Sequence, residues 1–217
     1  DSFLALDTLP VLAVADGMGG YAGGDVASSL AIKEIKNYWQ RGVQNGKVMD
    51  DVVASMELAN YAVFEKTLEM VELCRMGTTL TIAVVMGGYA CVGHVGDSRC
   101  LHYSKRMEKW QTITKNQNLE SDLIAAGVTG QAAGGWSNHL TQVVGRQENI
   151  VPLTYKFEIE PDDYLLLATD GFFGGGIERE LNELTAQHNK INKLGQILAK
   201  RSMEPRCNFL RRDDIAT

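Results

Sequence analysis

The order of helical and strand patterns along the chain limits the folds that it can adopt. After a short apolar stretch at 11–15, the segments 25–39 and 50–72 carry apolar residues at helical spacing. A long run of strand patterns follows, and two further helical segments, 177–186 and 189–202, come after it. Helices gathered before and after a run of strands favour an α+β fold over a doubly wound parallel sheet.

The strand patterns begin with a hairpin. "TTLTIAVVM" (78–86) is rich in β-branched residues, Gly87-Gly88 predicts a tight turn, and "YACVGHV" (89–95) follows as the next strand. Five more segments are expected, namely strands at 99–104, 108–114, 154–160 and 164–169 and a short helix at 117–126. The stretch 128–138 is rich in Gly and Ala without a clear period, which is typical of a mobile surface segment.

The composition is that of an ordinary globular protein and argues against several functions. The 217 residues are 45% hydrophobic and 22% charged, which suits a sizeable core. The net charge of −6, without a basic stripe, argues against a nucleic-acid partner. No apolar run approaches the ~20 residues that span a bilayer, so no membrane partner is expected. The four cysteines form no CxxC pair and the four histidines no zinc-ligand pattern, which predicts reduced thiols in a cytoplasmic protein.

Two predicted strands end in the same way. "VLAVADGMGG" (11–20) reaches Asp16-Gly17, and "YLLLATDGFFGGG" (164–176) reaches Asp170-Gly171. Each Asp-Gly pair taken alone is most simply a turn, because Asp bonds its own backbone and Gly tolerates positive φ. The glycines after Asp16 match neither a Walker loop nor a dinucleotide-binding fingerprint.

Two more acidic positions lie at strand boundaries. Asp97 follows an apolar strand in "VGDSR", and Asp213-Asp214 precede a β-branched segment in "RRDDIAT". Carboxylates at the ends of strands can converge at one edge of a sheet. Carboxylate and carbonyl oxygens are the ligands that Mg²⁺ and Mn²⁺ select. The sequence therefore allows a site for two such ions, which could catalyse in-line displacement at phosphorus.

These motifs together resemble the PPM family of metal-dependent Ser/Thr protein phosphatases (type 2C), in its bacterial form. Six segments carry the resemblance in the family's order: "VADGMGGYAGGDVAS", "MGTTLTIAVV", "HVGDSRC", "LTQVVG", "LLLATDGF" and "RDDIAT". Each segment alone is a weak signal. Six in order, at the usual separations, cover essentially the whole chain and make a specific match.

The resemblance implies one catalytic domain over residues 1–217. Its expected fold is a four-layer αββα sandwich, with two central, mostly antiparallel sheets flanked by helix pairs. Residues 117–138 match the family's flap, a variable element near the active site. Since the sequence starts with Asp rather than Met, and its last strand stops at Thr217, earlier than the family's, we expect it to be trimmed at both ends.

The resemblance also implies a binuclear centre of Mn²⁺ or Mg²⁺. By motif, Asp16 bridges the two ions, the Gly17 carbonyl helps to hold the second, and Asp170 and Asp213 complete the first site. A shift of one residue would move the last ligand to Asp214.

Two further acids do not bind the two main ions directly in the family pattern. Asp1 matches the last residue of the family's "NED" box and would bind water held by the metal. Asp97 matches the "GDSR" aspartate, which would help Asp170 to hold a possible third ion.

The implied reaction is hydrolysis of phosphoserine and phosphothreonine by a hydroxide that bridges the two ions. The implied partners are phosphorylated proteins and a cognate Ser/Thr kinase, and we expect a monomer.

The chain departs from the family pattern at several positions. The family's phosphate-binding Arg lies a few residues before the position of Asp1. Lys115-Asn116 stand where many bacterial members have Asp-His, and Gln142 stands where the motif has Arg. Residues 1–217 are therefore expected to hydrolyse poorly at low substrate concentration. A KM equal to that of an N-terminally extended chain would indicate that another cation, Arg99 or Arg146, binds the phosphate, although Arg99 is expected to pair with a nearby carboxylate.

These departures leave two other functions open. One is a catalytically impaired family member that acts as a regulatory binding module. The other is a SpoIIE-like phosphatase that acts on an anti-sigma antagonist, since "DDIAT" resembles that branch. The presence of Asp16, Asp170 and Asp213 argues against an inactive protein, because crowded acids are costly unless they serve a function.

Overall fold

The computed structural model describes residues 1–6, 9–19, 21–69, 76–128, 134–173, 177–187, 194–198 and 200. It has antiparallel sheets together with helices, so the predicted α+β class is confirmed. Among the helices of these residues, none combines the length and the apolar character needed to cross a membrane.

The larger sheet has five strands, and every neighbouring pair is antiparallel. Its order is β1 (Ser2–Ala5), β2 (Val11–Ala15), β5 (Leu80–Met86), β6 (Tyr89–Val95) and β9 (Leu153–Glu158). The predicted hairpin is confirmed, because Gly87 and Gly88 both have positive φ between β5 and β6. The edge strand β1 was not predicted, since four residues give too short a pattern.

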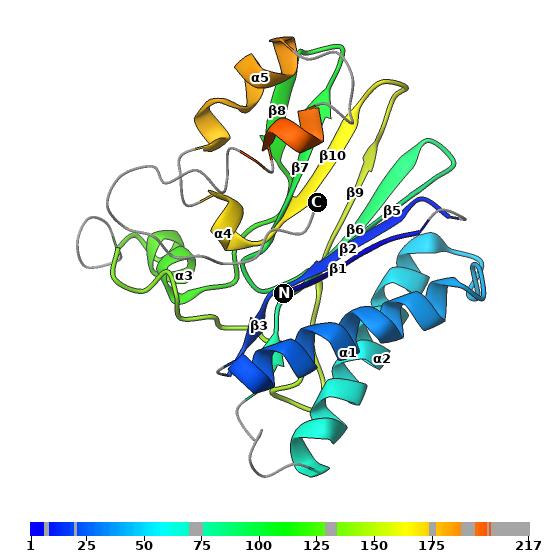
Figure 1. Ribbon diagram of the computed structural model, residues 1–217, viewed down its shortest axis with the longest axis vertical. Helices are drawn as coiled ribbons and strands as arrows, with labels where there is room; N and C mark the ends of the chain where they lie inside the picture. The colour runs from blue at the N-terminus through cyan, green and yellow to red at the C-terminus, as the bar shows by residue number, and fades with distance from the viewer. Residues whose placement is uncertain are drawn as a thin grey trace.

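Two long helices cover one face of this sheet (Figure 1). They are α1 (Tyr21–Trp39) and α2 (Val48–Glu69), and they bury Trp39 and Met56 against the strands. The prediction started the first helix at Asp25, but α1 begins four residues earlier. The predicted start rested on the apolar spacing from Val26 and on a carboxylate near free N–H groups, and glycine is a poor helix former. Gly24 lies inside the helix, where its lack of a side chain allows a close contact described below.

The smaller sheet has the order β10 (Tyr164–Ala168), β7 (Arg99–Ser104) and β8 (Lys109–Thr112). Its outer face packs on α4 (Asp170–Phe173), η3 (Ile177–Arg179) and α5 (Leu181–Gln187). The helix predicted over 177–186 is therefore divided into η3 and α5. Of the helix predicted over 189–202, residues 194–198 and 200 are described and are helical.

The inner faces of the two sheets pack on one another through an apolar layer. Its buried members come from β2, β5, β6, β7 and β10, and they are Val14, Ala83, Val92, Cys100 and Leu167. Strand residues alternate between this layer and the outer helices, since Leu101 and Tyr103 face the helices while Cys100 faces the other sheet. The packing brings the ends of strands from both sheets to a common edge.

Candidate active site

The backbone of Asp16 is fixed where β2 ends. Its N–H donates to the Thr79 hydroxyl at 2.9 Å, and its carbonyl accepts from the Thr79 N–H and the Thr78 hydroxyl, both at 2.9 Å. These bonds tie Asp16 to the segment that joins β4 (Gly77–Thr78) to β5. The residue after it, Gly17, belongs to the two-residue strand β3 (Gly17–Met18), which pairs with β4.

Gly17 is a glycine because helix α1 approaches it closely. A Cβ atom placed on Gly17 would lie 2.1 Å from the carbonyl oxygen of Gly24, which is a collision with backbone. The glycine that follows Asp16 is therefore required by packing between β3 and α1. Its expected second role, a carbonyl that binds metal, stays a prediction.

Asp97 lies in the turn between β6 and β7, and its neighbours are held on both sides. The Gly96 N–H donates to Gln117 Oε1 at 2.8 Å, and the Gln117 N–H donates to the Gly96 carbonyl at 2.7 Å. On the other side, the hydroxyls of Ser98 and Thr79 are 2.7 Å apart. Thr79 thus connects the support of Asp97 to that of Asp16.

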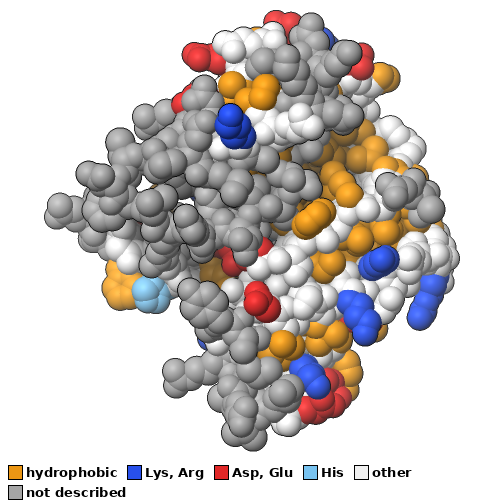
Figure 2. All heavy atoms as spheres, in the orientation of Figure 1, with side chains coloured by type: hydrophobic (Ala, Val, Ile, Leu, Met, Phe, Trp, Pro, Cys, Tyr) orange, Lys and Arg blue, Asp and Glu red, His pale blue; other side chains and the backbone are white. Residues whose placement is uncertain are grey.

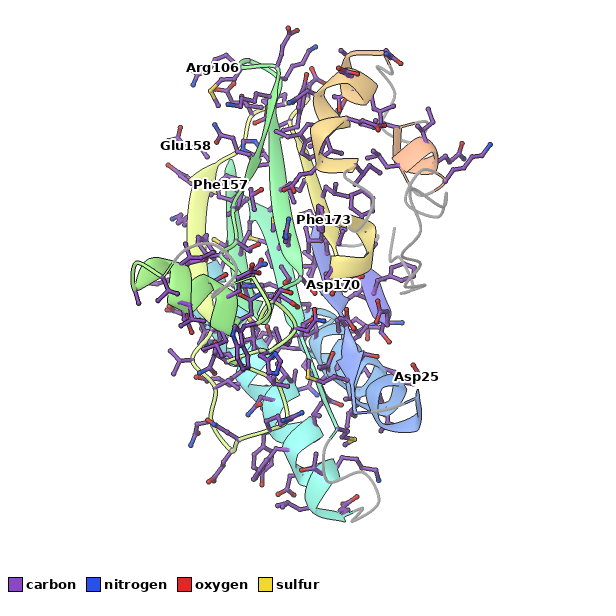
Figure 3. The ribbon with its side chains drawn as sticks, turned by 90° about the vertical axis from the view of Figure 1, so that its left-hand side faces the viewer. Asp25, Arg106, Phe157, Glu158, Asp170 and Phe173 are labelled. Atoms are coloured by element: carbon purple, nitrogen blue, oxygen red, sulfur yellow. The ribbon has the colours of Figure 1, made fainter. Side chains whose placement is uncertain are left out.

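Asp170 begins helix α4, directly after β10 and Thr169. Strand β10 pairs antiparallel with β7 in a register that sets Ala168 opposite Arg99. Asp170 lies two residues after this last pair and Asp97 two residues before it, and Asp170 is near enough to raise the pKa of Asp97. In Figure 3, Asp170 lies near the middle of the molecule, whereas Arg106 lies at one end of its long axis.

The three acids line one cleft of about 410 Å³. Figure 2 shows acidic side chains in the middle of the face that it presents, close to where Figure 1 marks the N-terminus. The cleft walls come from many elements, and the lining residues are Asp16, Met18, Thr79, Asp97, Asn138, His139, Leu140, Val143, Arg146 and Asp170. The structure therefore brings together three of the acids that the sequence singled out, from strand ends far apart in the chain.

The crowding of acids affects their ionisation. The pKa of Asp97 is raised from 3.8 to about 6, first by burial and then by the nearby Asp170 carboxylate, while its backbone hydrogen bond and Arg99 lower it in part. A divalent cation between such carboxylates would favour the ionised form.

Replacing Asp97 by Asn is expected to stabilise the metal-free protein near pH ~7 and to change little near pH ~4. A raised folded-state pKa means that its stabilising contribution is complete below 3.8 and is lost as pH rises through about 6. Asn cannot ionise and so avoids this loss. The test measures the melting temperatures of the parent and the Asn variant in excess chelator at both pH values. A difference in melting temperature that is the same at pH ~4 and pH ~7 would contradict the prediction.

Asp1 adds an observation that fits a metal site. Its Oδ2 atom is buried and has no hydrogen-bond partner. The β1–β2 register ends at the pair of Ser2 and Ala15, and Asp1 and Asp16 are the residues next to this pair in the chain. An unpaired buried carboxylate oxygen is costly unless a cation or ordered water contacts it.

The described residues do not complete a metal site on their own. Asp213 and Asp214 lie outside them, so the structure does not place the third expected ligand. Among the residues that are described, no three His, Cys, Asp or Glu side chains come close enough together to hold an ion. The acids of the cleft nevertheless offer carboxylate oxygens, which are the ligands that Mn²⁺ and Mg²⁺ prefer.

Several residues of the site were not predicted. Thr79 and Gln117 act through hydrogen bonds to distant backbone, and no local pattern signals such bonds. Gln117 lies in the segment that departs from the family pattern, yet it holds Gly96 beside Asp97. Arg146 was one of two candidate cations, and the structure places it in the cleft wall. The other, Arg99, pairs with Glu178 at 3.1 Å, as expected.

The chain is similar to known phosphatases over most of its length. The family model described as "Protein phosphatase 2C" matches residues 1–214. The protein phosphatase PhpP of Streptococcus pneumoniae is 32% identical over 168 residues, and the match covers 74% of this chain and 66% of PhpP. The serine/threonine phosphatase stp of Listeria innocua is 25% identical over 208 residues, with coverage of 88% and 77%. The chain thus spans just under two thirds of the length of the pneumococcal relative.

Solved structures of bacterial Ser/Thr phosphatases share the fold of this chain. The Mycobacterium tuberculosis serine/threonine phosphatase PstP/Ppp aligns with a TM-score of 0.78 at 25% identity, covering 89% of this chain and 81% of that one. A structure of the PstP catalytic domain in complex with 2 manganese ions aligns with a TM-score of 0.77 at 24% identity, covering 89% and 80%. Together with the family model, these likenesses show that the chain belongs to the protein phosphatase 2C family of bacterial Ser/Thr phosphatases.

Proposed function

We propose that this chain hydrolyses phosphoserine and phosphothreonine in proteins, with two Mn²⁺ or Mg²⁺ ions as cofactors and a possible third. The observation that carries the proposal is the convergence of Asp16, Asp97 and Asp170 on one cleft. Three carboxylates in one cleft repel a phosphate dianion unless cations lie between them. When bound, the ions would activate water and neutralise charge on the phosphate.

The chain's own residues would divide the work of holding these ions. Asp16, the Gly17 carbonyl, Asp170 and Asp213 are proposed as direct ligands. Thr79 would keep Asp16 in place through its two hydrogen bonds to the Asp16 backbone. The Gly96–Gln117 pair would orient Asp97, which is proposed to serve the third ion, and Asp1 would hold water bound to the metal.

We also propose a complete fold, a flap, a source of substrate and a cellular location for this enzyme. We propose that the complete domain is the four-layer αββα sandwich, which the helices packed on the outer faces of both sheets support. We also propose that residues 117–138, whose Asn138 lines the cleft, act as a substrate-selecting flap. A cognate Ser/Thr kinase would supply the substrate, and the protein would act in the cytoplasm as a monomer.

The proposal is tested by phosphate release from peptides in the presence of Mn²⁺. Phosphothreonine and phosphoserine peptides are expected to be hydrolysed, and the matched phosphotyrosine peptide far more slowly. Release from none of them would favour the impaired, regulatory member of the family. A SpoIIE-like specificity would appear as hydrolysis of a phosphorylated anti-sigma antagonist but not of kinase-type substrates.

A further inference from the structure

Arg146 is a cation in the wall of an acidic cleft. It lines the same space as Asp16, Asp97 and Asp170, and its side chain is exposed. Within the described part of the chain, it forms no ion pair with an acidic side chain. Arg99, by contrast, is engaged, because it pairs with Glu178 and lies 4.6 Å from the centre of the Phe173 ring. The positive charge of Arg146 is therefore available to a ligand of the cleft.

The backbone on both sides of Arg146 is fixed by one buried side chain of helix α2. Asn60 accepts from the Gly145 N–H at 2.8 Å through Oδ1. Its Nδ2 donates to the carbonyls of Gln147 at 3.0 Å and Glu148 at 2.9 Å. Asn60 thus binds the residue before Arg146 and the two residues after it, so the segment keeps one conformation.

A second set of contacts joins this segment to the site. Val144 exchanges two backbone hydrogen bonds with Thr78, at 3.1 and 2.9 Å, and the Thr78 hydroxyl donates to the Asp16 carbonyl. Gly145 has φ of +86°, and a Cβ there would lie 2.2 Å from the Val63 side chain, so the segment packs tightly on α2. Strand β4, through Thr78, therefore positions both Asp16 and the segment that carries Arg146.

We propose that Arg146 binds the phosphate group of the substrate, an inference that rests on the proposed phosphatase function. Its planar guanidinium can donate two parallel hydrogen bonds to phosphate oxygens, which a Lys ammonium cannot match. Because the backbone is already fixed, only the side chain loses conformational freedom when the phosphate binds. The anion would then be held between this cation and the cations bound by the acids.

The test compares Arg146→Ala and Arg146→Lys with Arg106→Ala as a matched control. Arg106 lies at the far end of the molecule from Asp170 (Figure 3). Arg146→Ala is expected to raise KM for a phosphothreonine peptide about 10- to 100-fold, with a smaller change in kcat, as for loss of hydrogen bonds to a charged group. Arg146→Lys should fall between Arg146→Ala and the parent, and Arg106→Ala should match the parent.

Binding is measured separately from turnover, in the presence of Mn²⁺, with a fluorescent peptide that carries a non-hydrolysable phosphonate. Arg146→Ala is expected to weaken its binding by the same factor as it raises KM. Equal affinity for Arg146→Ala and Arg106→Ala would overturn the assignment of Arg146. If the parent binds the phosphonate peptide but hydrolyses no phosphopeptide, the proposed function fails, while the binding comparison still decides the role of Arg146.

Discussion

Replacing Asp170 by Asn is expected to lower the rate of phosphopeptide hydrolysis by about 100-fold or more, which corresponds to about 2.7 kcal/mol of transition-state stabilisation. The amide keeps the size of the side chain but removes the charge that would attract a divalent cation. Asp170 is the first residue of α4 and lies in the cleft wall, so little packing is lost. The measurement is kcat in saturating Mn²⁺, together with a melting curve to show that the variant is folded.

The matched control is Asp162→Asn. Asp162 is an exposed residue in the turn between β9 and β10, and Asn tolerates its positive φ of 70°. This variant should retain the parental rate. A parental rate for Asp170→Asn as well would mean that Asp170 is a turn residue and not a metal ligand.

Replacing Asp51 by Ala is expected to reduce the free energy of unfolding by about 3–4 kcal/mol, since it removes the acceptor of the buried Tyr38 hydroxyl and of three partly buried N–H donors. The Asp51 side chain is completely buried near the start of α2. Its carboxylate accepts from the Tyr38 hydroxyl, from the N–H groups of Gln44 and Asn45, and from the Asn45 side chain. These bonds fix the connection between α1 and α2.

Urea unfolding of three variants tests this role. Asp50→Ala is the control, because Asp50 is the exposed neighbour on the same helix, and it should change stability little. Tyr38→Phe removes one donor and should cost about 1 kcal/mol. Burial, and then the Asp51 carboxylate, raise the pKa of Tyr38 to about 12, so the hydroxyl stays protonated over the pH range of such measurements. An Asp51→Ala midpoint equal to that of Asp50→Ala would contradict the assignment.

Much of the fold could be predicted because its signals are local. Strands β6 and β7 were predicted with their observed bounds, since β-branched and aromatic runs end there at a glycine turn and a polar residue. The start of α1 was wrong because a tertiary contact, Gly24 against Gly17, overrides the low helix propensity of glycine. The short strand β1 is formed by its pairing with β2, which no local pattern reveals.

The candidate site also has residues that the sequence could predict and residues that it could not. Asp16, Asp97 and Asp170 stand at strand ends that the sequence marks clearly, and the structure brings them to one cleft. Thr79, Gln117 and Asn60 could not be predicted, because each acts on backbone that lies 21 to 88 residues away in the chain. Asp213 lies outside the described residues, so its role rests on the family pattern alone.

The central claim is that the acids of the cleft act through divalent cations. Its most direct test is the rate of phosphate release from a phosphothreonine peptide by the parent protein, first in excess chelator and then after Mn²⁺ or Mg²⁺ is restored. We predict that the rate falls to the uncatalysed background in chelator and recovers when either ion is added. Undiminished hydrolysis by the chelated protein would contradict the claim.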